Sequence, residues 1–156
     1  MILLSRHQLG FTLVELILVI VLLGIVSAVA IPRFSNTTSF DERVLFDDTL
    51  NALRYSQKLA VASGCNIQFS INSNSFNVLH DDSCKSGNFT AGLTVNHPAN
   101  GETSYTGSQS NISLPATQAN TVFDALGRAS TDNIISVGTR KISIISATGF
   151  SYDSTP

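Results

Sequence analysis

The sequence predicts an α+β protein in which one long N-terminal helix packs on a mostly antiparallel β-sheet head. Three observations along the 156 residues support this prediction. Residues 13–31 are almost entirely apolar. Residues 40–63 repeat apolar side chains with the period of an amphipathic helix, and the chain from residue 65 onward alternates apolar and polar side chains as strands do. We therefore expect a helix over residues 11–63 and a β-rich head over residues 64–156.

The composition argues against a nucleic-acid-binding protein. Hydrophobic residues make up 43% of the chain and charged residues 13%, and the apolar share is concentrated in the N-terminal segment. The nine basic residues are outnumbered by eleven acidic ones, which gives a net charge of -2. Nucleic-acid-binding domains usually carry an excess of basic residues. A nucleic-acid partner is therefore not expected.

The apolar segment, with a predicted membrane-embedded part at about residues 11–31, contains one carboxylate, Glu15. The segment is too long for the apolar region of a secretory signal peptide and long enough to cross a bilayer as a helix. A carboxylate inside a membrane helix costs roughly 2.5–3.5 kcal/mol, so Glu15 needs a partner. A cut before Phe11 would create an α-amino group four residues away. Glu15 would also lie in the first helical turn, where the helix dipole favours negative charge.

Residues 10–32, GFTLVELILVIVLLGIVSAVAIP, resemble the class III signal of type IV prepilins and pseudopilins. The shared features are the glycine before the cut, the phenylalanine after it, the glutamate five positions into the mature chain and the proline that closes the apolar run. The resemblance implies a pilin fold and a leader of residues 1–10, which a membrane-bound prepilin peptidase removes after Gly10. It implies N-methylation of Phe11, and pairing of Glu15 with the terminal amine of a neighbouring subunit.

The same resemblance implies where the protein acts and with which partners. The precursor would cross the inner membrane once with its head in the periplasm, and would then enter a filament at the cell surface or in the periplasm. Its partners would be other pilin subunits and an inner-membrane assembly platform. Gly24 and Pro32 would weaken the helix locally, because proline lacks a backbone N–H and glycine has a low helix propensity. The expected role is structural, without enzymatic activity, cofactor or metal.

The second half of the predicted helix has one apolar stripe that should pack against a sheet. Two sets of side chains recur every seven residues: Leu45, Ala52 and Leu59, and Phe46, Leu53 and Ala60. The helix should end at Ser63-Gly64, where glycine supplies the usual left-handed cap.

The head should begin with a β-hairpin. Apolar and polar residues alternate over 67–71 and again over 76–80, and residues 72–74, Asn-Ser-Asn, predict the turn between them. Further strands are expected at 93–97, 111–114, 121–124, 134–137, 141–146 and 150–152. Residues 98–110 are rich in Gly, Ser, Asn and Thr, which predicts a long exposed loop.

Cys65 and Cys84 are predicted to form a disulfide. Both follow the apolar segment, so they would lie on the outer, oxidising side of the membrane. They flank the predicted hairpin, and a bridge over this distance in sequence would contribute about 3 kcal/mol in the chain-entropy estimate.

The last third of the chain, NTVFDALGRAS followed by RKISIISATGF, is similar to the tail of GspH/FimT-like minor pilins and pseudopilins. Residues that match are Phe123, Asp124, Gly127, Arg128, Thr148 and Gly149. From the residues alone, 125–127 read as a β-turn in which Gly127 allows a positive φ. The segments 30–34 and 64–65 also resemble minor pilins of the mannose-sensitive haemagglutinin pilus.

Three functions are compatible with these resemblances. The expected function is that of a minor subunit of a type IV pilus in surface attachment or pilus biogenesis. A type II secretion pseudopilin of the GspH type is the second. The third is a FimT-like minor pilin that binds DNA in natural transformation, for which Arg128, Arg140 and Lys141 could converge on one edge of the head. The negative net charge argues against this third function.

Residues 80–83, His-Asp-Asp-Ser, carry the side-chain types of a catalytic triad. Neighbours in sequence rarely form such a triad, and this stretch lies where the chain must turn. We therefore interpret it as a solvated turn.

Overall fold

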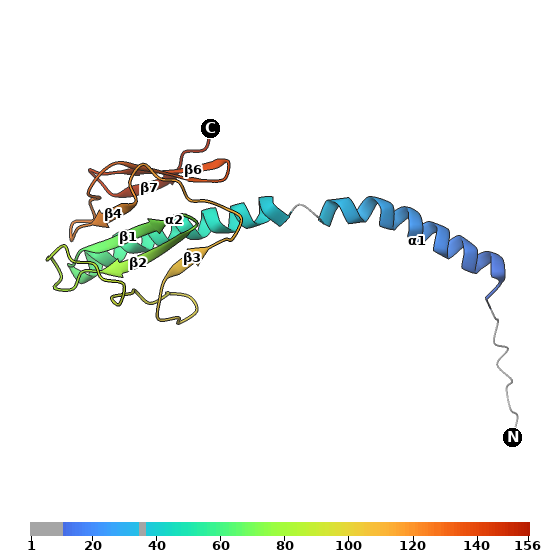
Figure 1. The fold of residues 1–156 in the computed structure, drawn as a ribbon, viewed down its shortest axis with the longest axis horizontal. Coiled ribbons are helices and arrows are strands. Elements are labelled where there is room, and N and C mark those ends of the chain that lie inside the picture. Colours follow the sequence, from blue (N-terminus) through green and yellow to red (C-terminus); the bar gives the residue numbers. More distant parts are fainter. Residues whose placement is uncertain (1–10, 35–36) are drawn as a thin grey trace, which may run out of the picture. The chain divides into compact units, whose positions relative to one another are not determined.

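The computed structural model describes residues 11–34 and 37–156 of the chain. The chain divides after Thr37 into two units. The first contains helix α1 (Leu13–Phe34), and helix α2 (Thr37–Ser63) begins at the boundary and continues into the second, the head (Figure 1). The predicted helix over residues 11–63 is thus described as two helices, and residues 35–36 lie outside the described part.

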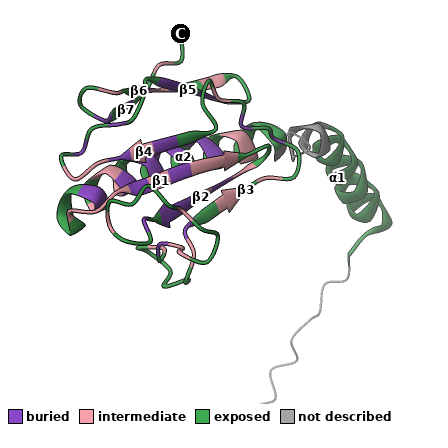
Figure 2. Ribbon diagram, turned by 60° about the vertical axis from the view of Figure 1, so that its left-hand side comes forward, coloured by how far each residue is buried: buried purple, intermediate pink, exposed green. Residues whose placement is uncertain are grey.

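The head consists of α2 and two antiparallel sheets (Figures 1 and 2). The four-stranded sheet has the order β3-β2-β1-β4, and the three-stranded sheet has the order β5-β6-β7. Their bounds are β1 (Ile67–Asn72), β2 (Ser75–His80), β3 (Thr106–Ser108), β4 (Asn120–Phe123), β5 (Asn133–Val137), β6 (Arg140–Ile145) and β7 (Phe150–Asp153). The predicted α+β architecture, with a long helix packed on antiparallel β-sheets, is therefore observed.

One hydrophobic core joins α2 to both sheets. Phe46 and Leu53 of α2 are at most 2% exposed, and they belong to the same cluster of buried side chains as residues of both sheets. From the four-stranded sheet these include Phe69 and Phe76, and from the three-stranded sheet Ile135 and Ile142. The heptad-spaced stripe predicted on α2 is buried as expected, with Leu59 only partly covered. α2 ends at Ser63, and Gly64 follows with a φ of 70°.

The predicted hairpin is confirmed. β1 pairs with β2 in antiparallel register from Ile67 opposite His80 to Asn72 opposite Ser75. Ser73 in the turn has a φ of 55°. The predicted strands 121–124, 134–137, 141–146 and 150–152 correspond to β4 to β7 with shifts of one residue at most of their ends.

Two predicted strands are wrong, and one strand was missed. Residues 93–97 make only an isolated bridge, Thr94 opposite Leu79. The reason is that this segment and the segment that leads into β3 both bond to the outer edge of β2. Val95 donates to the carbonyl of Val78, and Val78 donates to that of Tyr105, which leads into β3. β3 lies within residues 98–110, where a loop was predicted.

Residues 111–114 form no strand in the described head. Ile112 and Leu114 are buried, as their alternation suggested, but the backbone makes no ladder. Leu114 donates instead to the carbonyl of Ser73 in the hairpin turn. Alternating burial is therefore achieved here without a partner strand.

The predicted disulfide is present between Cys65 and Cys84, whose Cα atoms lie 4.4 Å apart. Hydrogen bonds around the bridge hold the same two segments together. Asn66 N–H donates to the carbonyl of Cys84, and Asp81 N–H donates to the carbonyl of Asn66. The bridge therefore joins the end of α2 and the start of β1 to the loop that leaves β2.

Candidate functional site

The N-terminal end of α1 is built by a side-chain cap. The N–H of Glu15 donates to Thr12 Oγ1 over 3.2 Å, and the N–H of Leu16 donates to the Thr12 carbonyl. Thr12 is therefore the N-cap, and Glu15 is the third residue of the helix, which is the Thr-x-x-Glu spacing of a capping box. Phe11, 83% exposed, precedes the cap. The carboxylate thus lies in the first turn, as predicted, one turn from the point where a cut before Phe11 would leave an amine.

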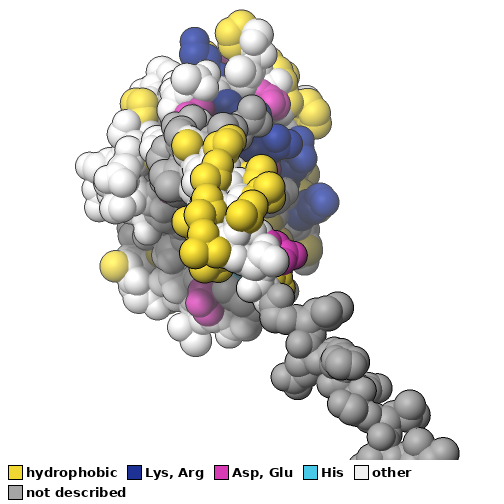
Figure 3. All heavy atoms as spheres, turned by 90° about the vertical axis from the view of Figure 1, so that its right-hand side faces the viewer, with side chains coloured by type: hydrophobic (Ala, Val, Ile, Leu, Met, Phe, Trp, Pro, Cys, Tyr) yellow, Lys and Arg dark blue, Asp and Glu magenta, His cyan; other side chains and the backbone are white. Residues whose placement is uncertain are grey.

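Apart from Glu15 and Ser27, the described side chains of α1 are apolar, and they are exposed. The large hydrophobic ones from Leu13 to Val26 are 43–73% exposed, with no polar face among them. Hydrophobic side chains are exposed on the face that Figure 3 shows, among white atoms of other side chains and of the backbone. A helix that is hydrophobic all round is normally buried in a protein or in a membrane. The exposed apolar side chains of α1 are therefore expected to be covered by another protein or by a membrane.

The two residues predicted to weaken this helix lie inside it. α1 continues through Gly24 and ends at Phe34, two residues after Pro32. A Cβ atom at Gly24 would meet no atom within 4 Å, so the helix itself does not require glycine there. The effect of both residues on helix order stays a prediction. Gly10, the predicted leader residue, lies outside the described residues.

No helix in the described ranges is both long and apolar enough to be identified as a membrane span.

The Phe-Asp-x-x-Gly-Arg segment at the end of β4 forms a compact turn. The Asp124 carboxylate accepts hydrogen bonds from the N–H groups of Leu126 and Arg128, and it forms an ion pair with the Arg128 guanidinium at 2.7 Å. Although burial opposes ionisation, these contacts lower the pKa of Asp124. Gly127 has a φ of 78°, as the predicted turn requires.

This turn packs against the Thr148-Gly149 turn between β6 and β7. Gln57 of α2 joins them, because its Nε2 donates to the carbonyl of Gly127 at 3.1 Å and to that of Thr148 at 2.7 Å. Gly149 has a φ of 63°, and a Cβ atom there would overlap the carbonyl oxygen of Gly127. The residues matched to the GspH/FimT-like tail therefore fasten both sheets to α2.

The three basic residues considered for DNA contact do not converge. Arg128 lies near the end of β6, because the N–H of the next residue, Ala129, donates to the carbonyl of Ser146, just after that strand. Arg140 and Lys141 are the first two residues of β6. The two ends of a six-residue strand are about 17 Å apart. Arg128 is paired with Asp124, and Arg140 lies 3.9 Å from Asp153 with its guanidinium over the Phe46 ring.

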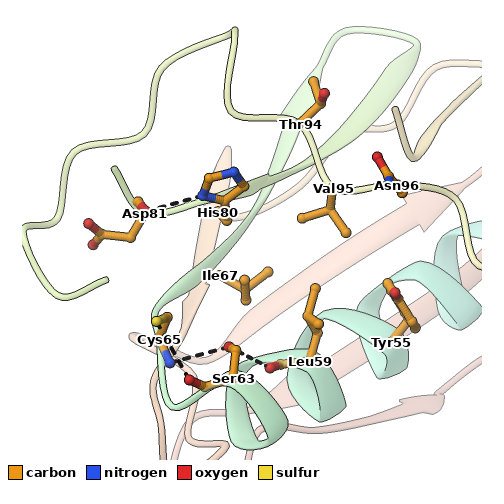
Figure 4. Close-up of a pocket in the computed structure, with 10 residues that line it drawn as sticks. All are labelled: Tyr55, Leu59, Ser63, Cys65, Ile67, His80, Asp81, Thr94, Val95 and Asn96. Atoms are coloured by element: carbon orange, nitrogen blue, oxygen red, sulfur yellow. Dashed lines mark hydrogen bonds between the residues drawn. The ribbon is translucent and has the colours of Figure 1, made fainter. Parts of the chain in front are cut away.

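A pocket of about 500 Å³ lies between α2, β1 and the segment 94–96 (Figure 4). His80 and Asp81 lie at one end, but the His80 Nδ1 is 3.2 Å from the backbone carbonyl of Asp81 and not from its carboxylate. The carboxylate accepts hydrogen bonds from Ser83, Ser86 and Gly87 instead. Burial opposes its ionisation, but these bonds prevail and lower the pKa of Asp81 to about 2. The stretch 80–83 is thus a structured turn and not a triad.

Sequence reasoning missed two positioning residues. The Thr12-x-x-Glu15 spacing is a recognised capping signal and could have revealed the N-cap. Gln57 carries no such local signal, because its two acceptors are 70 and 91 residues away in sequence.

Comparison with known proteins connects the N-terminal segment to pilins. Residues 5–31 match the family described as the prokaryotic N-terminal methylation motif. The chain is 43% identical over 51 residues to the type IV narrow pilus major component PilA5 of Thermus thermophilus. This match covers 33% of the present chain and 44% of the relative, so it spans less than half the length of that protein.

The fold is similar to that of a solved minor pilin. Two crystal structures of the type IV minor pilin FimU of Pseudomonas aeruginosa match with TM-scores of 0.50 and 0.52. They cover 72% and 76% of this chain and 91% of FimU, at 13% and 12% identity. At this identity the likeness establishes the fold alone.

Proposed function

We propose that this chain, which is type IV pilin-like in its N-terminal motif and in its fold, is the precursor of a minor subunit of a type IV pilus. The observation that carries the proposal is the combination of two features in one chain. The methylation motif occupies residues 5–31, and a head with the fold of a minor pilin follows it. The subunit would serve surface attachment or pilus biogenesis as a structural component, without catalysis.

Each part of the chain has a role in this proposal. A prepilin peptidase cuts after Gly10 and methylates Phe11. The exposed apolar surface of α1 is then covered by the inner membrane, with the head in the periplasm, until an assembly platform moves the subunit into the filament among other pilin subunits. Glu15 lies in the first turn of α1, where its carboxylate can form an ion pair with the terminal amine of a neighbouring subunit. The cost of a bare carboxylate in the membrane supports such pairing.

A type II secretion pseudopilin of the GspH type is the alternative, because it would use the same N-terminal processing. The similarity of the fold to that of a minor pilin supports the role of a pilus subunit over that of a pseudopilin. DNA uptake gains no support from the head, since Arg128 and Arg140 lie in ion pairs at opposite ends of β6.

The test is the mass and N-terminal sequence of the protein purified from its own host. The expected mature chain begins at Phe11 carrying one methyl group and is found in filaments sheared from the cell surface. A Gly10→Arg variant should keep its leader and stay in the membrane. A wild-type chain that still begins at Met1, or that is absent from sheared filaments, would contradict the proposal.

A further inference from the structure

The outer face of the four-stranded sheet carries no charged side chain. The inner face of this sheet packs on α2, since Phe69 and Phe76 belong to the common core (Figures 1 and 2). Side chains alternate between the two faces along a strand, so the less buried residues between the buried ones point outward. Seven of these outward residues carry small polar side chains, and we call them the polar face. They are Ser70, Asn72, Ser75, Asn77, Thr106, Ser108 and Asn120.

The strand register arranges the polar face in two neighbouring rows. The longer row crosses all four strands, in the order Asn120, Ser70, Asn77 and Thr106. The shorter row crosses three strands, in the order Asn72, Ser75 and Ser108. Neighbouring strands lie about 4.8 Å apart, so the longer row measures about 14 Å. A hollow of about 380 Å³ lies over β1, β2 and β3 and is lined by members of both rows.

The lack of charge on this sheet is not explained by solubility. None of the nine basic and eleven acidic residues of the chain lies in β1 to β4. The three-stranded sheet, by contrast, contains Arg140, Lys141 and Asp153. Solvent-facing surfaces usually carry charged side chains, and edge strands carry lysine in particular, which keeps other strands away. β3 is an edge strand and has no charged residue.

The hydrogen-bonding groups of the polar face are largely unused within the subunit. In the described part of the chain, its side chains make one hydrogen bond, from the Ser75 hydroxyl to the carbonyl of Asn72 over 3.1 Å. Each amide and each hydroxyl group can both donate and accept. The polar face therefore offers donors and acceptors together, in two rows and without charge.

This chemistry distinguishes among classes of ligand. Anionic ligands and nucleic acids are bound through Lys and Arg, which the polar face lacks. The cores of protein interfaces are enriched in aromatic residues, Met and Arg, and no large hydrophobic side chain of β1 to β4 is exposed. A neutral sugar carries many hydroxyl groups, which donate and accept hydrogen bonds, and no charge. The polar face is therefore complementary to carbohydrate.

We propose that the polar face of the four-stranded sheet binds a neutral polysaccharide, with Ser70, Asn77 and Thr106 at the centre of the site. The inference rests on the proposed function in surface attachment, for which a polysaccharide on another surface is a suitable ligand. The longer row extends beyond one sugar ring, so a chain of sugars is bound and not a monosaccharide. The contacts are hydrogen bonds and not ion pairs, so salt does not weaken them as it weakens exposed charge pairs.

Retention of the full-length protein on polysaccharide beads tests this proposal. The protein is kept in a zwitterionic detergent, because detergents with sugar head groups would compete. The neutral probes are cellulose, cross-linked dextran and galactomannan, and carboxymethyl cellulose is the acidic one. At least one neutral probe should retain the wild-type chain, equally at low and at high salt. Retention by none of the neutral probes, by carboxymethyl cellulose alone, or only at low salt would overturn the proposal.

Substitutions in the longer row test the position of the site. Asn77→Ala and Thr106→Ala should each weaken binding to the neutral probe about fivefold, the scale of one hydrogen bond. The matched control is Asn51→Ala, which removes an exposed amide from α2 and should leave binding unchanged. Thermal unfolding of each variant monitors the fold. Binding that equals wild type in both test variants, or that falls as far in the control, would overturn the site.

The two proposals fail in different ways. Wild-type chains absent from sheared filaments would overturn the proposed function. Wild-type chains that are present in filaments, but that no neutral probe retains, would overturn the carbohydrate site alone.

Discussion

Gly149 lies at the contact of two turns that close the head. Its φ of 63° is a conformation that L side chains rarely adopt, and a Cβ atom would overlap the backbone oxygen of Gly127. We expect Gly149→Ala to lower the free energy of unfolding by about 3 kcal/mol or more, from the positive φ together with the overlap. Thermal unfolding of the head measures this loss.

The matched control for Gly149 is Gly92→Ala. Gly92 has no positive φ, and a Cβ atom there would meet nothing within 4 Å. Its replacement should leave the unfolding temperature nearly unchanged. Equal stability of the two variants would show that the contact between the turns is not needed for the fold.

Glu15 should be required for assembly and dispensable for folding of the head. The residues of the hydrophobic core begin at Leu45, so Glu15→Gln should not change thermal unfolding of the head. Entry into sheared filaments should fall by about tenfold or more, because the incoming amine would lose its counter-charge in an apolar surrounding. The measurement compares variants at equal amounts in the membrane.

Ser27→Ala is the control for Glu15→Gln within the same helix. The Ser27 hydroxyl donates to the carbonyl of Leu23 in its own helix, so its loss should not affect assembly. Normal entry of Glu15→Gln into filaments would mean that this carboxylate is not the docking group.

Among the elements, the β5–β6 hairpin is attached to α2 by Glu42. Its carboxylate accepts hydrogen bonds from the Thr139 hydroxyl at 2.7 Å and from the Thr139 N–H at 2.8 Å. The Thr139 hydroxyl and then its N–H lower the pKa of Glu42 from its usual 4.5, with a smaller effect of the Arg140 charge. The stability that Glu42 contributes is therefore fully present above pH 4.5 and is lost as the pH falls through the lowered pKa.

Replacing Glu42 by glutamine should remove this contribution. At pH 7 we expect Glu42→Gln to lower the free energy of unfolding by at most about 1 kcal/mol, because the amide oxygen can still accept both hydrogen bonds but carries no charge. The difference from wild type should shrink at pH 3, where more of the wild-type carboxyl is protonated than at pH 7. Thermal unfolding at both pH values checks this, and the exposed Glu102→Gln provides the control. A difference that stays constant with pH would exclude the charge of Glu42 as its source.

The sequence predicts elements best where the signal is local. The β1–β2 hairpin was predicted because alternation and a turn signal coincide within fourteen residues. β3 was missed because Thr106–Ser108 is a triplet without apolar side chains. It is a strand only because it pairs with the edge of β2. Residues 111–114 were predicted wrongly, because their alternation reflects burial of Ile112 and Leu114 and not a partner strand.

The same limit applies to the candidate site. The N-terminal motif is contiguous, so its residues could be named from the sequence. The joint contact of Gln57 with residues 127 and 148 depends on the tertiary fold, and no pattern near residue 57 announces it. Arg128 and Arg140 were considered together for the DNA-binding alternative, and the length of β6 lies between their positions in the fold.

For the whole molecule, the division after Thr37 predicts that the head folds without α1. The core of buried hydrophobic residues draws no member from residues before 45 in the described part. A chain of residues 38–156 should be soluble and should unfold in one transition at the same temperature as the head of the full chain in detergent. Circular dichroism during heating provides the comparison. A shortened chain without a cooperative transition would show that α1 is needed for folding.

The uncovered surface of α1 also determines how this sequence can change over evolutionary time. Its large hydrophobic side chains are exposed and belong to no buried core, so we expect that exchanging one aliphatic side chain for another leaves the stability of the head intact. The same exchange at Phe46 or Leu53 alters the packing of a closed core, where a change of a few methylene groups costs kilocalories. Substitutions of the apolar side chains from Leu13 to Val26 are thus filtered by apolarity, and substitutions in the core of the head are filtered by shape.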